Sequence, residues 1–387
     1  MNIHDILFQL GEDSIHQSHP ASPPIYQTSN FTFENVANMS SALANEHVEP
    51  FYTRGANPTV LLLQKKIAAL EQTDAALIFS SGSAAISAAV LSQVKSGDHI
   101  VCVSNPYSWT KKLLTVILEK FGVTNDFPSA NNTDAIIASC KPNTRLIYLE
   151  SPNSWTYEMQ DLERIAVFAK SKGITTIIDN SCASPLYQQP AKYGIDIVVH
   201  SATKYLAGHA DLVAGVLCTN QDLYLQIFKS EYMTLGGIIS PNDAWLMIRS
   251  LRTLELRMEK VGSNALLVAE FLEDHTHIER LYYTHSPSFA QSDLVDKYLS
   301  GNGGLMTIDL KTKEPKKVVK FCDALNRFKL GCSWGGFESL AFPAITTMSS
   351  LNYDKPDIAM NRIRLYVGLE EAALLIEDLK HALQQLD

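Results

Sequence analysis

The sequence predicts an α/β protein: a three-layer α/β/α domain around a mostly parallel sheet, followed by a smaller C-terminal α+β domain. Between residues 51 and 245, short apolar runs rich in β-branched residues alternate with stretches of helical periodicity, which is the order of βαβ units. The runs are apolar on both faces, as in the strands of a buried parallel sheet. After residue 245 the alternation ends, and helical patterns with isolated strands predict the second domain.

The chain of 387 residues is too long for one compact core. We divide it into an N-terminal arm over residues 1–50, a large domain over 51–245 and a C-terminal domain over 246–387. The arm has weak periodicity, and its segment HPASPPIYQTSNF contains three prolines, which favour extended or looped backbone. We expect this arm to reach over a neighbouring subunit.

The predicted strands of the large domain are, in chain order, Ala76–Phe79, Ile100–Val103, Leu146–Leu149, Thr175–Ile178, Ile195–Val199 and Val213–Cys218. The predicted helices of this domain are Thr59–Leu70, Ala84–Val94, Thr110–Phe121 and Leu162–Ser171. In the C-terminal domain we expect helices over Leu246–Arg257, Ala265–Leu272 and Glu370–Leu386, and strands over Gly304–Leu310 and Ile363–Val367. Ligands of such parallel sheets bind beyond the carboxyl ends of the strands, so the residues after each strand are the candidate site residues.

The composition argues against several classes of function. A formal net charge of −9 does not supply the basic surface of a nucleic-acid binder. The six cysteines form no CxxC pair, which is typical of reduced thiols and predicts neither a disulfide framework nor a metal site. The N-terminus lacks the basic and apolar regions of a signal peptide, and no apolar run reaches the roughly 18–20 residues of a membrane span. We therefore expect a cytoplasmic protein that binds neither nucleic acid nor membrane.

Two residues at predicted strand ends carry the main chemical signal. Asp179 ends an apolar strand, where a carboxylate is costly unless it caps a turn or is paired with a cation. One such cation is the pyridinium nitrogen of pyridoxal 5′-phosphate (PLP), which an aspartate keeps protonated. Lys204 follows the next strand, after Ser201 and Thr203, and a lysine there either begins a surface turn or forms an imine with a carbonyl cofactor. Together, on successive strands, Asp179 and Lys204 favour a PLP site with Lys204 as its Schiff-base lysine.

A third strand end offers a place for a phosphate. The small residues Ser81, Gly82 and Ser83 lie between a predicted strand and a predicted helix, and backbone N–H groups at a helix N-terminus bind anions. Ser81 could equally be an ordinary N-cap. The hydroxyls of Ser201 and Thr203 could bind the same phosphate. The segment is not a P-loop, and no GxGxxG fingerprint follows a strand, which disfavours a dinucleotide site.

The segment HSATKYLAGHADLVAG, residues 200–215, resembles the lysine signature of the Cys/Met-metabolism (trans-sulfuration) family of fold-type I PLP enzymes. The family pattern is a Ser-x-Thr-Lys-Tyr run followed by Gly-His-x-Asp, and the resemblance covers most of the chain. It implies the aspartate aminotransferase-like fold, PLP as the cofactor and a sulfur amino acid as the substrate. It also implies a homotetramer of two dimers, with each active site shared between two subunits.

The resemblance implies roles for individual residues. YTRGANPT, residues 52–59, resembles the loop whose Tyr52 and Arg54 reach the PLP phosphate of the neighbouring subunit. Tyr107 falls where the family has a tyrosine that stacks on the PLP ring. The implied catalytic residues are Lys204, Tyr107 and Asp179. The implied cofactor-binding residues are Lys204, Asp179, Tyr107, Ser81, Gly82, Ser83, Ser201, Thr203, Tyr52 and Arg54. The implied substrate-binding residues are Arg364, Ser333, Trp334 and Tyr52.

Within the family, the chain is most similar to bacterial cystathionine β-lyases. The segment ESPNS, from Glu150 to Ser154, departs from the Glu-x-Pro-x-Asn-Pro of most members, whose Asn bonds to the 3′-oxygen of PLP. The segment CSWGGFESL resembles the Ser-Trp-Gly-Gly segment of β-lyases, and Cys332 stands where many γ-lyases have an acidic residue. Arg364 lies in a segment that resembles the one whose arginine binds the substrate α-carboxylate, and a guanidinium matches a carboxylate with two parallel hydrogen bonds. The segments YTRGANPT and FESLAFPAITT look as much like γ-lyases.

We therefore expect a PLP-dependent carbon–sulfur lyase that cleaves L-cystathionine or related cysteine S-conjugates by β-elimination to homocysteine or another thiol, pyruvate and ammonia. In this hypothesis Lys204 removes the α-proton, and Lys204 or Tyr107 protonates the leaving sulfur. The alternatives within the family are a cystathionine γ-lyase or γ-synthase, a methionine γ-lyase and an O-acetylhomoserine sulfhydrylase. A nicotinamide-dependent oxidoreductase is disfavoured by the missing glycine fingerprints. A scaffold without activity is disfavoured because Lys204, Asp179, Arg54 and Arg364 occur together.

Overall fold

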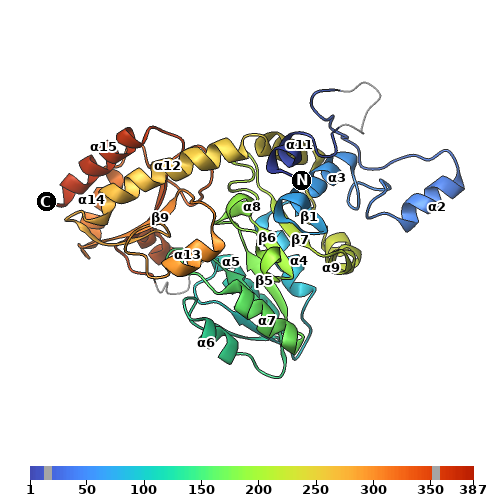
Figure 1. The fold of residues 1–387 in the computed structure, drawn as a ribbon, viewed down its shortest axis with the longest axis horizontal. Helices are drawn as coiled ribbons and strands as arrows, with labels where there is room; N and C mark the ends of the chain where they lie inside the picture. The colour runs from blue at the N-terminus through green and yellow to red at the C-terminus, as the bar shows by residue number, and fades with distance from the viewer. Residues whose placement is uncertain (13–19, 351–357) are drawn as a thin grey trace.

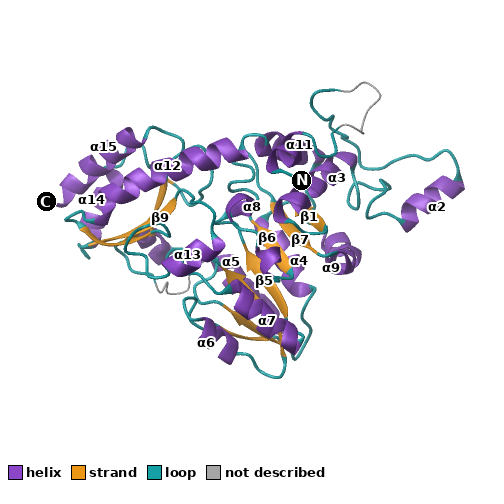
Figure 2. Cartoon of the chain, in the orientation of Figure 1, coloured by secondary structure: helices purple, strands orange, loops and turns teal. Residues whose placement is uncertain are grey.

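The computed structural model describes residues 1–12, 20–350 and 358–387, which form two β-sheets with helices packed on them (Figure 1). In Figure 2 the strands of the larger sheet lie among its helices, and the smaller sheet lies beneath the long helix α12 (Leu254–Glu273). The three-layer α/β/α fold with a smaller second sheet, predicted from the sequence, is confirmed. No helix of the described residues is long and apolar enough to cross a membrane.

The larger sheet has seven strands in the order β1-β7-β6-β5-β4-β2-β3. Strands β2 to β6 run parallel, whereas β7 pairs antiparallel with both β6 and β1. The bounds are β1 Ala75–Phe79, β2 His99–Cys102, β3 Thr124–Asp126, β4 Thr144–Glu150, β5 Thr175–Asp179, β6 Ile197–His200 and β7 Gly215–Thr219. All six predicted strands are present. The edge strand β3 was not predicted because it is short and polar.

Alternate side chains of each strand face two different hydrophobic cores. In β1, Ala76 and Ile78 belong to one core, and Leu77 and Phe79 belong to the other. Successive side chains of a strand point to opposite faces of the sheet, and both faces are buried here. The strands are therefore apolar throughout. Helices α3 (Pro58–Glu71) and α7 (Leu162–Lys172) cover the first face, and α4 (Gly82–Leu91) and α9 (Gln221–Ile227) cover the second.

Two predicted helical stretches differ from the observed ones. The expected helix Thr110–Phe121 is α5 (Ser108–Lys112), followed by a π-helical turn and a 3₁₀ turn. The π turn contains three consecutive β-branched residues, Thr, Val and Ile, which are restricted in an α-helix. The expected helix Leu246–Arg257 is divided between α11 (Pro241–Leu251) and α12, which also contains the expected Ala265–Leu272.

The smaller sheet has five strands in the order β10-β11-β12-β9-β8. Their bounds are β8 Ile278–Tyr282, β9 Leu305–Leu310, β10 Lys329–Leu330, β11 Leu340–Pro343 and β12 Arg362–Tyr366. Helices α12, α14 (Pro315–Asp323) and α15 (Ala372–Leu383) share a third hydrophobic core with this sheet. The remaining helices are α6 Thr133–Ala138, α8 Ser184–Tyr187, α10 Met233–Leu235 and α13 Ser292–Tyr298.

The N-terminal segment contains two helices, α1 (Ile3–Phe8) and α2 (Val36–Ala44). The carbonyls of Ile6 and Leu7 accept hydrogen bonds from the fully buried Lys66 ammonium of α3 at 2.9 and 3.3 Å, which ties α1 to the large domain. In contrast, α2 projects from the body of the molecule in Figure 1. The predicted domain boundaries at residues 50 and 245 stay predictions.

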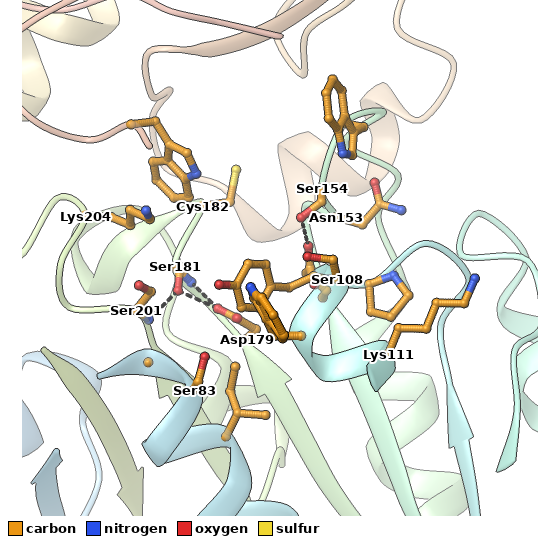
Figure 3. Close-up of a pocket in the computed structure, with 18 of the residues that line it drawn as sticks. Ser83, Ser108, Lys111, Asn153, Ser154, Asp179, Ser181, Cys182, Ser201 and Lys204 are labelled. Atoms are coloured by element: carbon orange, nitrogen blue, oxygen red, sulfur yellow. Dashed lines mark hydrogen bonds between the residues drawn. The ribbon is translucent and has the colours of Figure 1, made fainter. Parts of the chain in front are cut away.

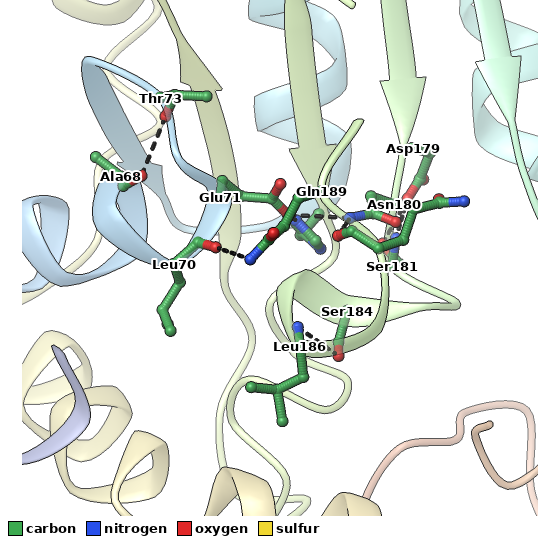
Figure 4. A network of polar contacts seen from close by, with 12 residues as sticks. Ala68, Leu70, Glu71, Thr73, Asp179, Asn180, Ser181, Ser184, Leu186 and Gln189 are labelled. Atoms are coloured by element: carbon green, nitrogen blue, oxygen red, sulfur yellow. Dashed lines mark hydrogen bonds and ion pairs between the residues drawn. The ribbon is translucent and has the colours of Figure 1, made fainter. Parts of the chain in front are cut away.

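A buried polar network lies at the carboxyl ends of β5 and β6 (Figure 4). Glu71, the last residue of α3, is fully buried, and its Oε1 accepts hydrogen bonds from His200 Nε2 at 2.5 Å and from Asn180 Nδ2 at 3.0 Å. Asn180 directly follows Asp179, and His200 directly precedes Ser201. One carboxylate therefore fixes the two strand ends on which the sequence placed its main candidate residues.

We expect the Glu71→Ala variant to lose about 3–5 kcal/mol of unfolding free energy, because truncation leaves the buried His200 without its partner. Urea denaturation followed by circular dichroism measures the change. Glu119→Ala is the control, since Glu119 is exposed, and its loss should stay below about 0.5 kcal/mol. Equal stability of the two variants would contradict a structural role for the pair.

Candidate active site

A cavity of about 510 Å³ opens at the carboxyl ends of the parallel strands, where the large domain meets the C-terminal sheet (Figure 3). This volume suits a small organic ligand. Residues that follow β1, β2, β4, β5 and β6 line one side, and residues from the loop before β11 and from β11 and β12 line the other. The position agrees with the general rule for ligands of parallel sheets.

Lys204 lies in the turn after β6, and its side chain faces the cavity. Its Nζ donates a hydrogen bond to Ser333 Oγ at 2.7 Å and lies 5.4 Å from the centroid of the Trp334 ring. Burial, together with the nearby charge of Arg364, lowers the pKa of Lys204 to about 8. A substantial neutral fraction at physiological pH makes this amine a competent nucleophile and base.

Gly335 lets the loop before β11 pack directly on the lysine turn. Its φ is +85°, and a Cβ at this position would lie 2.9 Å from backbone atoms of Lys204. Any side chain would therefore push the loop away from Lys204. The same loop carries Ser333 and Trp334, so Gly335 sets the contact of both residues with the lysine.

Asp179 is buried at the end of β5 and faces the cavity. Burial raises the pKa of this carboxyl, whereas hydrogen bonds from the Ser181 side chain and backbone, and the charges of His200 and Lys204, act in the opposite direction. Among the described residues, Asp179 has no cation at salt-bridge distance. A carboxylate held in this way can bind a cationic ring nitrogen that enters the cavity.

Glu150, at the end of β4, is the direct register partner of Asp179 on the neighbouring strand. Burial and the charge of Asp179 raise the pKa of Glu150 to about 7. Its Oε2 accepts a hydrogen bond from Tyr107 N at 2.8 Å, and its Oε1 accepts one from the hydroxyl of Ser154. In the sequence, Glu150 was considered only as part of a motif; its position at the end of an apolar strand was the available signal.

The N-terminus of α4 forms a cradle against the lysine turn. Ser81 caps the helix by accepting a hydrogen bond from Ala84 N at 3.1 Å, which leaves the earlier N–H groups of the helix directed at the cavity. A Cβ on Gly82 would lie 2.9 Å from the Cα of Ser201, so only glycine allows this close approach. Ser83, Ser201 and Thr203 line the same end of the cavity.

Arg364 extends from β12 into the cavity and lies beside two aromatic rings that contact each other. Its guanidinium carbon lies 5.5 Å from the centroid of Trp155 and 5.2 Å from that of Phe342, and Nη2 donates to the Cys332 carbonyl at 2.6 Å. Trp155 has a φ of +71°, a left-handed backbone conformation that is uncommon for a tryptophan. Trp155 and Phe342 were missed by the sequence analysis.

The structure brings together all but two of the predicted site residues. Tyr107 and Trp334 line the cavity with the residues described above. Tyr52 and Arg54 do not line it. They lie on the loop between α2 and α3, where Tyr52 is 42% exposed and the Arg54 guanidinium lies 5.5 Å from the Tyr52 ring. Their distance from this chain's own cavity is compatible with the prediction that they act in a neighbouring subunit.

The residues present fit PLP. Asp179 offers a carboxylate for the ring nitrogen, Lys204 offers an amine for the aldehyde, and the α4 N-terminus offers N–H groups for the phosphate. At Gly82 the close approach of Ser201 leaves no room for a side chain, so the backbone forms this part of the cradle. The described residues hold no cluster of histidine, cysteine and acidic side chains suited to a metal ion.

Comparisons with known proteins agree with this site. Residues 6–384 match the model of the family described as Cys/Met metabolism PLP-dependent enzyme. The chain is 36% identical over 370 residues to a cystathionine gamma-lyase of Bacillus subtilis, which covers 94% of both chains. It is 36% identical to an L-methionine gamma-lyase of Pseudomonas deceptionensis, over 97% of this chain and 96% of that one. It is also 36% identical to a cystathionine beta-lyase of Lactococcus lactis subsp. cremoris, over 94% of both.

We expect the protein stripped of cofactor to take up PLP faster as the pH rises through about 8, because only the neutral amine of Lys204 attacks an aldehyde. Because the pKa of Lys204 is lowered, the rate should rise at a lower pH than it would with an ordinary lysine. In Arg364→Gln the profile should move to higher pH, since a neighbouring positive charge is lost. Stopped-flow measurement of the visible absorption band gives the rate. Lys112→Gln, which removes another charge from the cavity lining, is the control; an equal shift in both variants would contradict the assignment to Arg364.

Proposed function

The chain belongs to the Cys/Met metabolism family of PLP-dependent enzymes, and from this premise we propose that it is a carbon–sulfur lyase of the cystathionine β-lyase type. PLP is the cofactor, and the reaction is that of a lyase. The proposed reaction is β-elimination from L-cystathionine or a related cysteine S-conjugate, with water consumed and a thiol, pyruvate and ammonia formed.

The observation that carries this proposal is the distribution of acidic groups around the cavity. γ-Elimination requires a base for a proton on the β-carbon in addition to the base for the α-proton. Among the described residues, the only carboxyl groups of the lining are Glu150 and Asp179, both at the ends of large-sheet strands. At this part of the lining, the loop over Lys204 presents Cys332, which has no carboxyl group. One base, Lys204, is sufficient for β-elimination.

Bound PLP supplies an electrophilic carbonyl for the substrate amine and a pyridinium ring that accepts electrons from the α-carbon. In our proposal Lys204 takes the α-proton onto Nζ, and a pKa of about 8 keeps the amine ready to accept it near neutral pH. The Ser333 hydroxyl orients Nζ through the 2.7 Å hydrogen bond. Asp179 holds the proton on the ring nitrogen.

Arg364 is the proposed site for the substrate α-carboxylate. The rings of Trp155 and Phe342 restrict the guanidinium, and the Cys332 carbonyl occupies one of its N–H groups. A guanidinium matches a carboxylate in shape and charge and can bind it with two parallel hydrogen bonds. The hydroxyl of Tyr107, or Lys204 with the proton it has taken, then protonates the leaving sulfur.

A γ-lyase is the second candidate function. Two of the three relatives named above are γ-lyases, and their identity to this chain equals that of the β-lyase. Overall similarity therefore supports both reactions equally. The cavity lining favours the β-lyase.

We also propose that the active site is completed by a second copy of the chain, within a homotetramer in the cytoplasm. Tyr52 and Arg54 are exposed or partly exposed on a loop next to α2, and α2 presents the exposed apolar side chains of Val36, Met39 and Leu43. An apolar projecting helix is costly in water and gains by packing on another subunit. Such packing would carry Arg54 toward a neighbouring phosphate cradle.

With L-cystathionine, we expect homocysteine and pyruvate in equal amounts, because the bond from sulfur to the β-carbon of the cysteine half breaks. Chromatography of both products after incubation with purified enzyme measures this. Cysteine with 2-oxobutyrate would contradict the β-lyase proposal and establish γ-elimination. The Lys204→Ala variant is the control and should form neither pair of products at a rate above about a thousandth of the parent.

The shared site predicts that two inactive variants complement each other. Lys204→Ala and Arg54→Ala should each be strongly impaired alone, whereas co-expression gives hybrid dimers with one intact site. About a quarter of the parent activity should return, since half of the dimers are hybrids and each has one intact site of two. A site contained within one chain would give no recovery. Co-expression of Lys204→Ala with Arg364→Gln is the matched comparison. Both altered residues lie in the same cavity of one chain, so we expect no recovery of activity.

A further inference from the structure

Glu150 and Ser154 form a polar pair in the cavity lining that none of the steps above uses. Glu150 accepts hydrogen bonds through both carboxylate oxygens, from Tyr107 N at 2.8 Å and from the Ser154 hydroxyl. The Tyr107 N–H binds Glu150 Oε2 and the Ser154 hydroxyl binds Oε1, so a proton carried on Oε1 would lie next to Ser154. The backbone N–H of Ser154 also bonds to this carboxyl. A serine hydroxyl has one proton to donate and two lone pairs to accept, so it can receive a proton from Glu150 and still donate its own.

The order of the strands indicates which atom of the cofactor Ser154 meets. In PLP the ring nitrogen lies opposite the aldehyde carbon, and the phosphate arm and the 3′-oxygen lie on opposite sides of that axis. The proposed partners lie across the sheet in the order of its strands. The phosphate cradle comes after β1, Lys204 comes after β6, Asp179 ends β5, and Ser154 comes after β4. Figure 3 shows Lys204 and Ser201 on one side of the pocket and Ser154 on the other, with Asp179 between them. PLP held by these partners would therefore present its 3′-oxygen on the side of Ser154.

We propose that the Ser154 hydroxyl, backed by a protonated Glu150, donates the hydrogen bond that holds the 3′-oxygen of PLP. This oxygen is anionic when the imine with Lys204 forms, and an anion at this point draws the Ser154 proton toward the cavity. Ser154 then accepts a hydrogen bond from Glu150 Oε1 instead of donating to it. The inference rests on the proposed role of Lys204, but it does not depend on whether the enzyme performs β- or γ-elimination.

The surroundings of Glu150 favour its protonated form. Burial raises the pKa of Glu150 to about 7, and the charge of Asp179 adds to this effect. The titratable groups that face Glu150 are Asp179 and Cys182 from the β5 side, Cys102 from β2 and Tyr148 from β4 itself. Burial raises the pKa of both thiols and of the phenol, so these three groups are neutral. Lys111 of α5 lines the same cavity, with its ammonium 5.9 Å from the Phe127 ring.

The test is the pH titration of the visible absorption of PLP-loaded enzyme without substrate, which reports the pKa of the imine nitrogen. A donor to the 3′-oxygen stabilises the phenolate and so lowers this pKa. Ser154→Ala should therefore raise the imine pKa by about one unit, as expected for the loss of one hydrogen bond to a charged oxygen. Ser154→Thr, which keeps the hydroxyl, and Glu150→Gln, whose amide still donates to Ser154, should both stay within about 0.3 units of the parent.

Asn153 is the competing donor, because its Nδ2 is buried and has no hydrogen-bond partner among the described residues. An unchanged imine pKa in Ser154→Ala with a raised one in Asn153→Ala would overturn the proposal and assign the contact to Asn153. A raised pKa in Glu150→Gln that equals that of Ser154→Ala would overturn the part given to protonated Glu150. Ser108→Ala, which removes another hydroxyl from the same cavity lining, controls for a general change of polarity, and a rise there equal to that in Ser154→Ala would also count against the proposal.

Discussion

Two buried carboxyl groups on neighbouring parallel strands set the electrostatics of this site. Glu150 and Asp179 are register partners at the ends of β4 and β5, and both are buried. Two adjacent negative charges in a low-dielectric environment repel strongly, so a proton on one of them is favoured. Asp179 has the Ser181 hydrogen bonds and the charges of His200 and Lys204 to stabilise its anion, whereas Glu150 faces Asp179. Two carboxyl groups on neighbouring strands therefore differ in surroundings: those of Asp179 stabilise its anion, and those of Glu150 favour its protonated form.

This arrangement requires support from outside the cavity. The strand end that carries Asp179 continues into Asn180, whose side chain bonds to the buried Glu71 of α3. Glu71 also accepts a hydrogen bond from His200, which precedes Ser201 and the lysine turn. A helix on one face of the sheet thereby holds both strand ends in register. On the opposite side of the cavity, the loop of the C-terminal sheet lies directly on Lys204 because Gly335 has no side chain. The position of the amine is thus determined from both domains.

The sequence was sufficient to predict those parts of the site that depend on one strand end at a time. Asp179 and Lys204 each follow an apolar run, and parallel strands place such residues at the same edge of the sheet. The raised pKa of Glu150 could not be predicted in this way, because it depends on the register of two strands that are 25 or more residues apart in the chain. Trp155 was missed because its left-handed backbone conformation arises from the tertiary structure of its loop. The edge strand β3 and the π turn after α5 were missed for a related reason, since short elements take their conformation from what they pack against.

The chain is as similar in overall sequence to two γ-lyases as to a β-lyase. Every reaction of the family needs a cofactor, an α-proton base and a site for the α-carboxylate, and the residues proposed for these tasks, apart from Tyr52 and Arg54, all lie in one cavity. The choice of bond that breaks depends on whether a second base reaches the β-carbon, which one or two side chains decide. A tenfold preference corresponds to about 1.4 kcal/mol of transition-state free energy, which is the size of one hydrogen bond to a charged group. In our proposal the difference between the two reactions arises in the loop over Lys204, and overall sequence identity does not report on so few residues.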